Sequence, residues 1–125
     1  MTKIRRLEEA DLEFAKSLTD AEEWGNSIED WQRLLRISIP LVAYQGDDLL
    51  GVTTAFDYGI LGMIGNVVVS ENSRGKGVGQ VLVKEAMNRL ESCKTVRLHS
   101  KMEIVSFYKD LGFFPEGMST FFRLE

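Results

Sequence analysis

Three glycines in alternate positions, Gly75, Gly77 and Gly79, follow a run of β-branched residues and precede an amphipathic pattern. Small residues at the start of a helix leave backbone N–H groups accessible, and the helix dipole favours negative charge there. Arg74 and Lys76 add positive charge to the same segment. The segment is therefore predicted to bind a phosphate, while the strand before it could support an extended arm of the same ligand.

Two common phosphate-binding motifs do not match this segment. A Walker A loop needs a lysine followed by Ser or Thr after its last glycine, and the sequence has no such pair here. A Rossmann fingerprint has the spacing G-x-G-x-x-G after an early strand, with an acidic residue after the next strand. Here the glycines alternate, and the next predicted strand is followed by Ser100 and Lys101. Both motifs are therefore excluded.

The pattern R-x-x-G-x-G, formed by Arg74, Gly77 and Gly79, resembles the acyl-CoA-binding motif of the GNAT superfamily of N-acetyltransferases. Downstream, residues 107–113 match the F-Y-x-x-L-G-F signature near the C-terminus of that family. One predicted helix and one predicted strand separate the two motifs, as in the family. The resemblance covers residues 41–125, and the pair of helices predicted before them also agrees with it.

The resemblance implies that acetyl-CoA is the co-substrate. No cluster of His, Cys and Asp has the spacing of metal ligands, so no metal is expected. Backbone groups of the strand before the glycines would pair with the pantetheine arm, and the amides after it would hold the pyrophosphate. A bulge at Gly65 and Asn66 would separate this strand from the one that starts at Thr95, which opens a gap for the arm. The implied cofactor-binding residues are Val67, Val68, Val69, Arg74, Gly75, Lys76, Gly77, Val78, Gly79 and Gln80.

The resemblance also implies a catalytic group. Tyr108 matches the family tyrosine that gives a proton to the departing CoA thiolate after direct attack by an amine. The alternative is that Tyr108 packs in the core and its hydroxyl only touches the cofactor. The sequence departs from the family pattern at Lys101 and Ile104, where Asn and Ala are common. Lys101 could contact a phosphate in place of the Asn, or lie exposed.

The acceptor side is less well marked. The resemblance places it at the first two helices and their connecting loop, where Trp24 and Asn26 are candidates, and Tyr58 could reach the same cleft. The acceptor would be a small-molecule amine or a protein amine. Residue type alone cannot select the general base among several carboxylates, which are Glu22, Glu23, Asp57, Glu71 and Glu103. A non-catalytic CoA-binding sensor or regulatory module is the alternative function, and a small structural module is a third.

These residues need a scaffold that the hydrophobic patterns predict. Strands are expected near residues 2–7, 41–44, 49–56, 63–69 and 95–99, and a terminal hairpin over residues 113–124. Helices are expected near residues 8–19, from an N-cap at Ser27, and over 103–111, while Val78, Val81, Leu82, Ala86 and Leu90 form the stripe of another. The predicted fold class is α/β (α+β), with a mixed, mostly antiparallel twisted sheet of six to seven strands flanked by about four helices.

Length and composition limit the remaining possibilities. The 125 residues are sufficient for one domain, residues 1–125, and 44% of them are hydrophobic. The net charge of −4 argues against a nucleic-acid partner. A single cysteine, Cys93, excludes an internal disulfide, and neither a membrane span nor a leader pattern is found, so a cytoplasmic protein is expected. A strand containing Phe121 and Phe122 could pair across a two-fold axis, which would give a homodimer.

Overall fold

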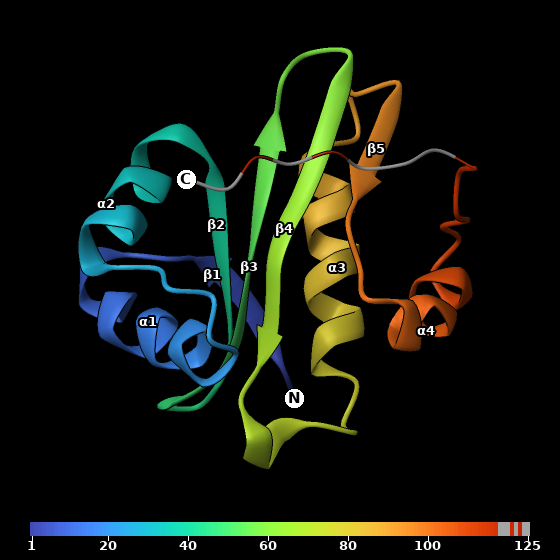
Figure 1. Ribbon diagram of the computed structural model, residues 1–125. Helices are drawn as coiled ribbons and strands as arrows, with labels where there is room; N and C mark the ends of the chain where they lie inside the picture. The colour runs from blue at the N-terminus through green and yellow to red at the C-terminus, as the bar shows by residue number, and fades with distance from the viewer. Residues whose placement is uncertain (118–120, 122, 124–125) are drawn as a thin grey trace.

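A computed structural model describes residues 1–117, 121 and 123 of the chain, and these form one twisted sheet with helices on both faces (Figure 1). The strands lie in sequence order across the sheet. Neighbouring strands are antiparallel except for the last pair, which is parallel and is connected through a helix. The strands are β1 (Lys3–Arg6), β2 (Ile39–Gln45), β3 (Asp48–Asp57), β4 (Leu61–Val69) and β5 (Thr95–Leu98).

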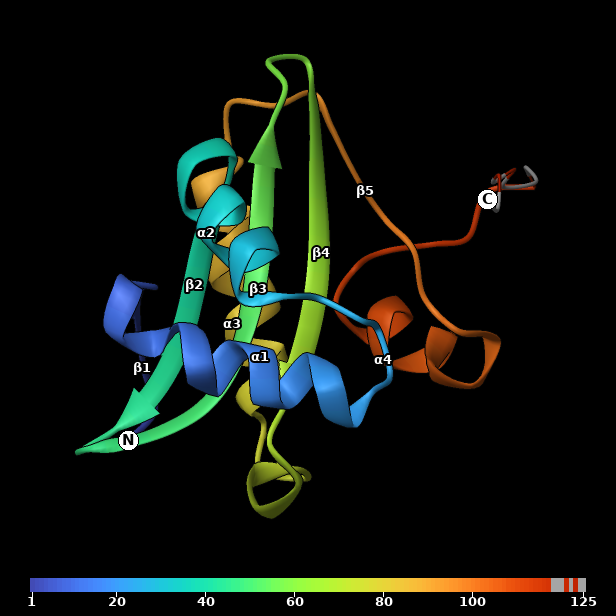
Figure 2. The ribbon, with the colours of Figure 1, turned by 60° about the vertical axis from the view of Figure 1, so that its left-hand side comes forward.

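The central strands are buried on both faces, so their sequences are almost continuously apolar. In β2, Leu41 and Ala43 face one layer of helix, and Val42 between them faces the other. Figure 2 shows α1 (Leu12–Ala21) and α2 (Ile28–Ile37) in front of the sheet and α3 (Val78–Arg89) behind it. The chain therefore has two hydrophobic clusters, one on each side of the sheet.

Local signals fix the ends of the first two helices. A short 3-10 helix, η1 (Glu9–Asp11), leads into α1, and its Asp11 accepts two hydrogen bonds from the Arg5 guanidinium. The capping box expected at Ser27 is present, because the Ser27 hydroxyl accepts from the Asp30 amide and the Asp30 carboxylate accepts from the Ser27 amide. Trp31 of α2 is fully buried against α1.

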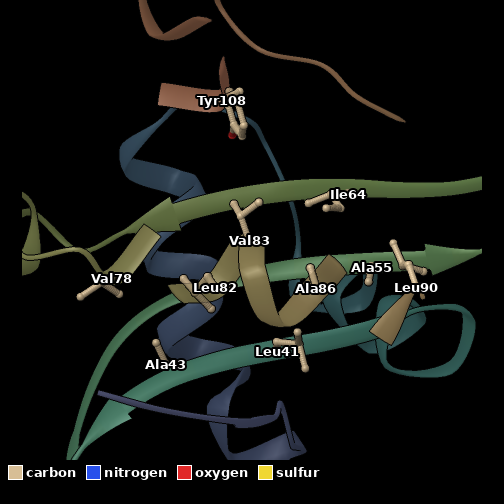
Figure 3. Packing of buried hydrophobic residues seen from close by; sticks show 10 residues of the cluster. All are labelled: Leu41, Ala43, Ala55, Ile64, Val78, Leu82, Val83, Ala86, Leu90 and Tyr108. Atoms are coloured by element: carbon tan, nitrogen blue, oxygen red, sulfur yellow. The ribbon is translucent and has the colours of Figure 1, made fainter. Parts of the chain in front are cut away.

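Helix α3 covers the other face of the sheet, and Figure 3 shows its side chains among those of β2, β3 and β4. The predicted stripe is correct except at Val81, which is 37% exposed, while Val83 is fully buried. The helix lies on a broad sheet surface, so its contact face is wider than a narrow i, i+3, i+4 stripe. Because the contact face is wide, Val83 lies within it, whereas Val81 lies at its edge.

The end of the described chain differs from the prediction. After η3 (Met102–Ile104), helix α4 (Val105–Asp110) ends just before Gly112, close to the expected end of the predicted helix at residue 111. The amides of Gly112 and Phe113 then donate to the carbonyls of Lys109 and Tyr108, which closes α4 in a Schellman motif. Because its amide caps this helix, Phe113 is not in a strand.

The first arm of the predicted hairpin is therefore wrong. Its second arm lies outside the described residues except for Phe121 and Arg123. The described residues contain five strands rather than six to seven. No helix in this part of the chain is both long enough and apolar enough to cross a membrane.

Candidate active site

The glycine segment forms an open turn between β4 and α3. A 3-10 helix, η2 (Glu71–Ser73), follows β4, and Gly77 is the N-cap of α3. Gly75 and Gly77 have φ values of 75° and 81°, in the left-handed region that L side chains rarely adopt. A Cβ atom at either position would meet no other atom within 4 Å, so glycine is needed here for backbone conformation rather than for space. The surface above the turn stays open.

The turn presents unused backbone donors. Among the described residues, no backbone carbonyl accepts a hydrogen bond from the amides of residues 75–80, and the first helical bond runs from the Val81 amide to the Gly77 carbonyl at 3.1 Å. The first turn of α3 carries no acidic residue, and no side chain caps it. Free N–H groups and the positive end of the helix dipole therefore coincide, as an anion site requires.

Strand β4 has a free edge immediately before this turn. Its pairing with β5 covers Leu61 to Ile64 and then stops, and Figure 1 shows the chain after β5 turning away toward α4. On the other side, Thr54 pairs with Gly65 but Val52 pairs with Val68, so β4 carries an extra residue. This bulge includes Asn66, whose φ is 51°. The predicted bulge and the predicted separation of β4 from β5 are both confirmed.

The free edge carries backbone groups that point away from β3. The Ser70 amide donates to the Leu50 carbonyl at 2.8 Å, so Ser70 faces β3. In an antiparallel pair the preceding residue, Val69, then faces the opposite edge. In agreement, the Val69 carbonyl accepts a hydrogen bond from Arg74 Nε at 3.1 Å. An extended ligand arm could pair with this edge as an added strand.

The side chain of Arg74 connects the free edge to the α1–α2 loop. Besides its bond to Val69, its Nη2 lies 3.4 Å from Glu22 Oε1 in an exposed ion pair. Lys76 lines a hollow together with Asp47 of the β2–β3 turn and Asp48 at the start of β3. Arg74 and Lys76 were both predicted to lie near a phosphate. In the structure Arg74 pairs with Glu22, and Lys76 lies near acidic residues.

Tyr108 lies on α4 and is only 8% exposed. Its ring makes edge-to-face contacts with Phe107 and Phe113, with centroids 4.9 and 6.1 Å apart. Burial raises the pKa of the phenol above its ordinary value of 10.0, so the hydroxyl is protonated at neutral pH. Figure 3 shows the side chain directed from α4 toward β4, with the oxygen at its tip.

The two sequence motifs are in contact. A Cβ atom on Gly79 would lie 3.4 Å from Cζ of Phe107 and 3.6 Å from Cγ2 of Val69. Phe107 of α4 and Val69 of β4 therefore both lie against the first turn of α3, and a hydrogen at Gly79 permits this approach. The glycine turn, the free strand edge and the residue before Tyr108 form one continuous site.

The predicted acceptor residues are not all brought together. Trp24, which is 43% exposed, and the half-buried Asn26 lie on the α1–α2 loop, which Figure 2 shows passing on the α1 and α2 face of the sheet. Tyr58 is 65% exposed, and its amide donates to the Leu61 carbonyl, which places Tyr58 at the start of β4. The α1–α2 loop lies near the other end of β4, because Glu22 contacts Arg74 in the segment that follows β4. A nine-residue strand spans about 30 Å. A small acceptor cannot reach both ends.

The remaining polar candidates are peripheral. The Cys93 thiol donates to Asp57 Oδ1 at 3.5 Å, and burial together with this carboxylate raises its pKa. Lys101 is exposed at the start of η3. Within the described residues, no three His, Cys, Asp or Glu side chains are placed to hold a metal ion. An open groove of about 980 Å³ between β5, α4 and the end of α3 is lined by Tyr108 but not by the glycine turn.

Two features of the site were not predicted. The Glu22–Arg74 pair joins residues 52 positions apart, and residue type alone placed Glu22 among five candidates. The other feature is Thr54, which lies fully buried beside the bulge with a hydroxyl that has no hydrogen-bond partner among the described residues. A threonine in a strand is common, so no sequence signal marks it.

The chain was compared with known proteins. Residues 36–115 match a family model described as the acetyltransferase (GNAT) domain. A relative from Pyropia yezoensis, the uncharacterized N-acetyltransferase ycf52, is 33% identical over 70 residues, which are 53% of this chain and 40% of the relative. The chain thus spans less than half the length of that relative.

The fold is also found in solved structures. Glucosamine-6-phosphate N-acetyltransferase from Arabidopsis thaliana has a TM-score of 0.82 at 20% identity, over 100% of this chain and 99% of that one. Rv2747 from Mycobacterium tuberculosis, solved in complex with CoA, has a TM-score of 0.80 at 19% identity, over 95% and 76% of the two chains.

Proposed function

This chain belongs to the GNAT acetyltransferase family, and we propose that it transfers an acetyl group from acetyl-CoA to an amine. The observation that carries the proposal is the continuity of the site. The open amides of residues 75–80 lie next to the free edge of β4 at Val69, and Phe107, the residue before the buried Tyr108, packs beside Gly79. An anion site, a strand edge and a proton donor suit a ligand with a pyrophosphate, an extended amide-containing arm and a thioester.

The residues of the turn would bind the pyrophosphate. Up to six amides, none bonded to another backbone group of the described chain, can donate to phosphate oxygens. The absence of acidic side chains from the first turn of α3 leaves the positive end of the dipole uncompensated. The structure of a family relative with CoA bound, that of Rv2747, supports the same ligand here.

The free edge of β4 would orient the arm. The carbonyl of Val69 points to this edge and is bonded by Arg74, so an amide of the arm would replace Arg74 Nε at that oxygen. Arg74 would then be available to a phosphate, as the sequence analysis proposed for it. Beyond Val69, the bulge at Asn66 bends the strand where the thioester would lie.

Acetyl-CoA supplies the acyl group in activated form, as a thioester. The neutral amine attacks the carbonyl carbon, a carbon–nitrogen bond forms, and the carbon–sulfur bond breaks with its electron pair on sulfur. Tyr108 Oη then gives its proton to that sulfur, and the amine loses a proton to solvent or to a carboxylate. The raised pKa keeps the phenol protonated until the thiolate appears.

The alternative function is a CoA-binding module without turnover. The ion pair between Glu22 and Arg74 favours it, because it engages one of the five candidate bases with another side chain of the site. The two functions share the site and differ only in the acceptor step.

A turnover assay tests the proposal. The purified chain is incubated with acetyl-CoA and, separately, aliphatic diamines, amino sugars and peptides with a free α-amino group, and the released CoA thiol is measured. We expect release that depends on one of these amine classes. Binding of acetyl-CoA without amine-dependent release from any class would support the alternative function instead.

A further inference from the structure

The hydroxyl of Thr54 is a buried polar group within the described part of the sheet. Thr54 is fully buried in β3, and its Oγ1 has no hydrogen-bond partner among the described residues. Its neighbour Thr53 is equally buried but donates to the Gly65 carbonyl at 3.0 Å. A buried hydroxyl without a partner costs folding free energy, and valine would fill the same volume without that cost. Folding stability therefore does not explain why this position carries a hydroxyl group.

The two residues that pair with Thr54 in the sheet have no polar side chain that could bond to its hydroxyl. In the sheet register Thr54 lies between Pro40 on β2 and Gly65 on β4. Proline has no amide hydrogen and glycine has no side chain. A Cβ atom on Gly65 would lie 3.2 Å from Thr54 Oγ1 and 3.6 Å from Cε2 of Phe56. A polar group at the Cβ position of Gly65 would thus lie within hydrogen-bonding distance of the hydroxyl, with the edge of the Phe56 ring beside it.

The cover over this space reaches the protein surface. Phe56 is only partly buried, and its ring stacks on that of Tyr58 with centroids 6.1 Å apart and planes 7° apart. Tyr58 is well exposed at the β3–β4 turn. Phe56, which lies beside the Cβ position of Gly65, thus connects this interior point to the exposed ring of Tyr58.

The position of the hydroxyl relates it to the proposed acyl site. Gly65 immediately precedes the bulge at Asn66, and the pairing with β5 has ended one residue earlier, at Ile64. Thr54 alternates with Ala55, which packs toward α3, so the hydroxyl faces α1 and α2. The opposite face of β4 at Val67 and Val69 packs toward α3. The oxygen therefore lies beside the bulge on the side of the α1–α2 loop.

We propose that Thr54 Oγ1 accepts a hydrogen bond from the acceptor amine, which enters above Gly65 when Phe56 and Tyr58 move aside. This inference rests on the proposed acetyl transfer. A neutral amine has N–H donors and one lone pair, so a donor bonded to Thr54 leaves the lone pair to be directed at the thioester beside the bulge. The missing side chain of Gly65 supplies the space that the amine occupies. Tyr58 becomes part of the entrance rather than a direct contact.

Two substitutions at one position separate the hydroxyl from the shape of the side chain. Thr54→Val keeps the shape and removes the hydroxyl, while Thr54→Ser keeps the hydroxyl and removes a methyl group. For each variant and the parent, the melting temperature, the Kd of acetyl-CoA and the kcat/KM are measured. The amine is whichever of the diamine, amino-sugar and peptide classes the parent acetylates.

We expect Thr54→Val to melt at a higher temperature than the parent and to bind acetyl-CoA with the same Kd. Its kcat/KM for the amine should fall about tenfold or more, the effect of losing one hydrogen bond in the transition state. Thr54→Ser should melt at a lower temperature but keep kcat/KM within about threefold of the parent. A hydroxyl that binds the substrate makes Thr54→Val the more stable but less active variant and Thr54→Ser the less stable but more active one. A hydroxyl with only a structural role would not give this result.

Gly65→Ala provides a second, independent variant. Its methyl group would fill the space above Thr54, so kcat/KM for the amine should fall while acetyl-CoA still binds. An unchanged kcat/KM in Thr54→Val would overturn the inference and leave the proposed acetyl transfer intact. A lower melting temperature of Thr54→Val would also overturn it, because the hydroxyl would then have a structural partner such as an internal water. A parent chain that binds acetyl-CoA but acetylates no amine would refute both the proposed acetyl transfer and the proposed role of Thr54.

Discussion

Gly77→Glu tests the anion site at its centre. Gly77 is the N-cap of α3, with φ at 81° and open space where a side chain would project. A glutamate there meets no steric obstacle, so it would place a carboxylate over the free amides of residues 75–80. Gly77→Ala is the matched control, because it imposes the same backbone strain without the charge.

The size of the effect follows from two separate contributions. Any L residue in the left-handed region costs about 1 kcal/mol of folding free energy, and both variants carry this cost. Only the glutamate repels the ligand. With about 6 Å between the carboxylate and a pyrophosphate of two negative charges, and an effective dielectric constant of about 40, the repulsion is about 3 kcal/mol. This corresponds to a Kd about a hundredfold higher.

Calorimetric titration with CoA measures this difference. The two variants should have similar melting temperatures, and Gly77→Ala should bind CoA nearly as well as the parent. Gly77→Glu should bind far more weakly at low salt, and the difference between the variants should narrow in about 1 M salt, where the Debye length is about 3 Å. Equal Kd values for the two variants at low salt would refute the assignment of the anion site to this turn.

Three further predictions concern other parts of the chain. Tyr108→Phe should lower kcat by about a hundredfold or more and change the Kd of acetyl-CoA less than threefold, whereas equal losses in both would make Tyr108 a packing residue. Glu23 ends α1 in a Schellman motif with φ at 60°, a left-handed conformation that glycine adopts without strain. Glu23→Gly should therefore raise the free energy of unfolding by about 0.5–1 kcal/mol in a denaturant titration, and a decrease would contradict this reasoning. The hydrogen bond from Arg5 lowers the pKa of Asp11, so its stabilisation is present above the unfolded pKa and is lost as the pH falls through the folded pKa. Asp11→Asn should therefore reduce the free energy of unfolding by about 1–2 kcal/mol at pH 7, with the difference shrinking below about pH 4; a pH-independent difference would contradict the assignment.

Much of the fold could be predicted because its signals are local. The capping box at Ser27, the left-handed glycine after α4 and the glycine turn each depend on residues within one or two turns of chain. The bulge was also predictable, because a glycine, Gly65, lies inside the predicted strand over residues 63–69. These features specify where the elements begin and end.

The missed features depend on contacts between distant residues. The exposure of Val81 is set by the shape of the sheet surface under α3. Glu22 meets Arg74 because the α1–α2 loop returns to the end of β4. Thr54 lies between Pro40 and Gly65, two residues without polar side chains that belong to different strands. Sequence spacing carries no information on such pairings.

The central claim is that the open amides and the free edge of β4 bind acetyl-CoA. Calorimetric titration of the purified chain with acetyl-CoA, with CoA and ATP in parallel, tests it most directly. We predict micromolar binding of acetyl-CoA and CoA and no comparable binding of ATP, which lacks the arm that pairs with β4. No binding of acetyl-CoA by the folded chain, or equal binding of ATP, would contradict the account.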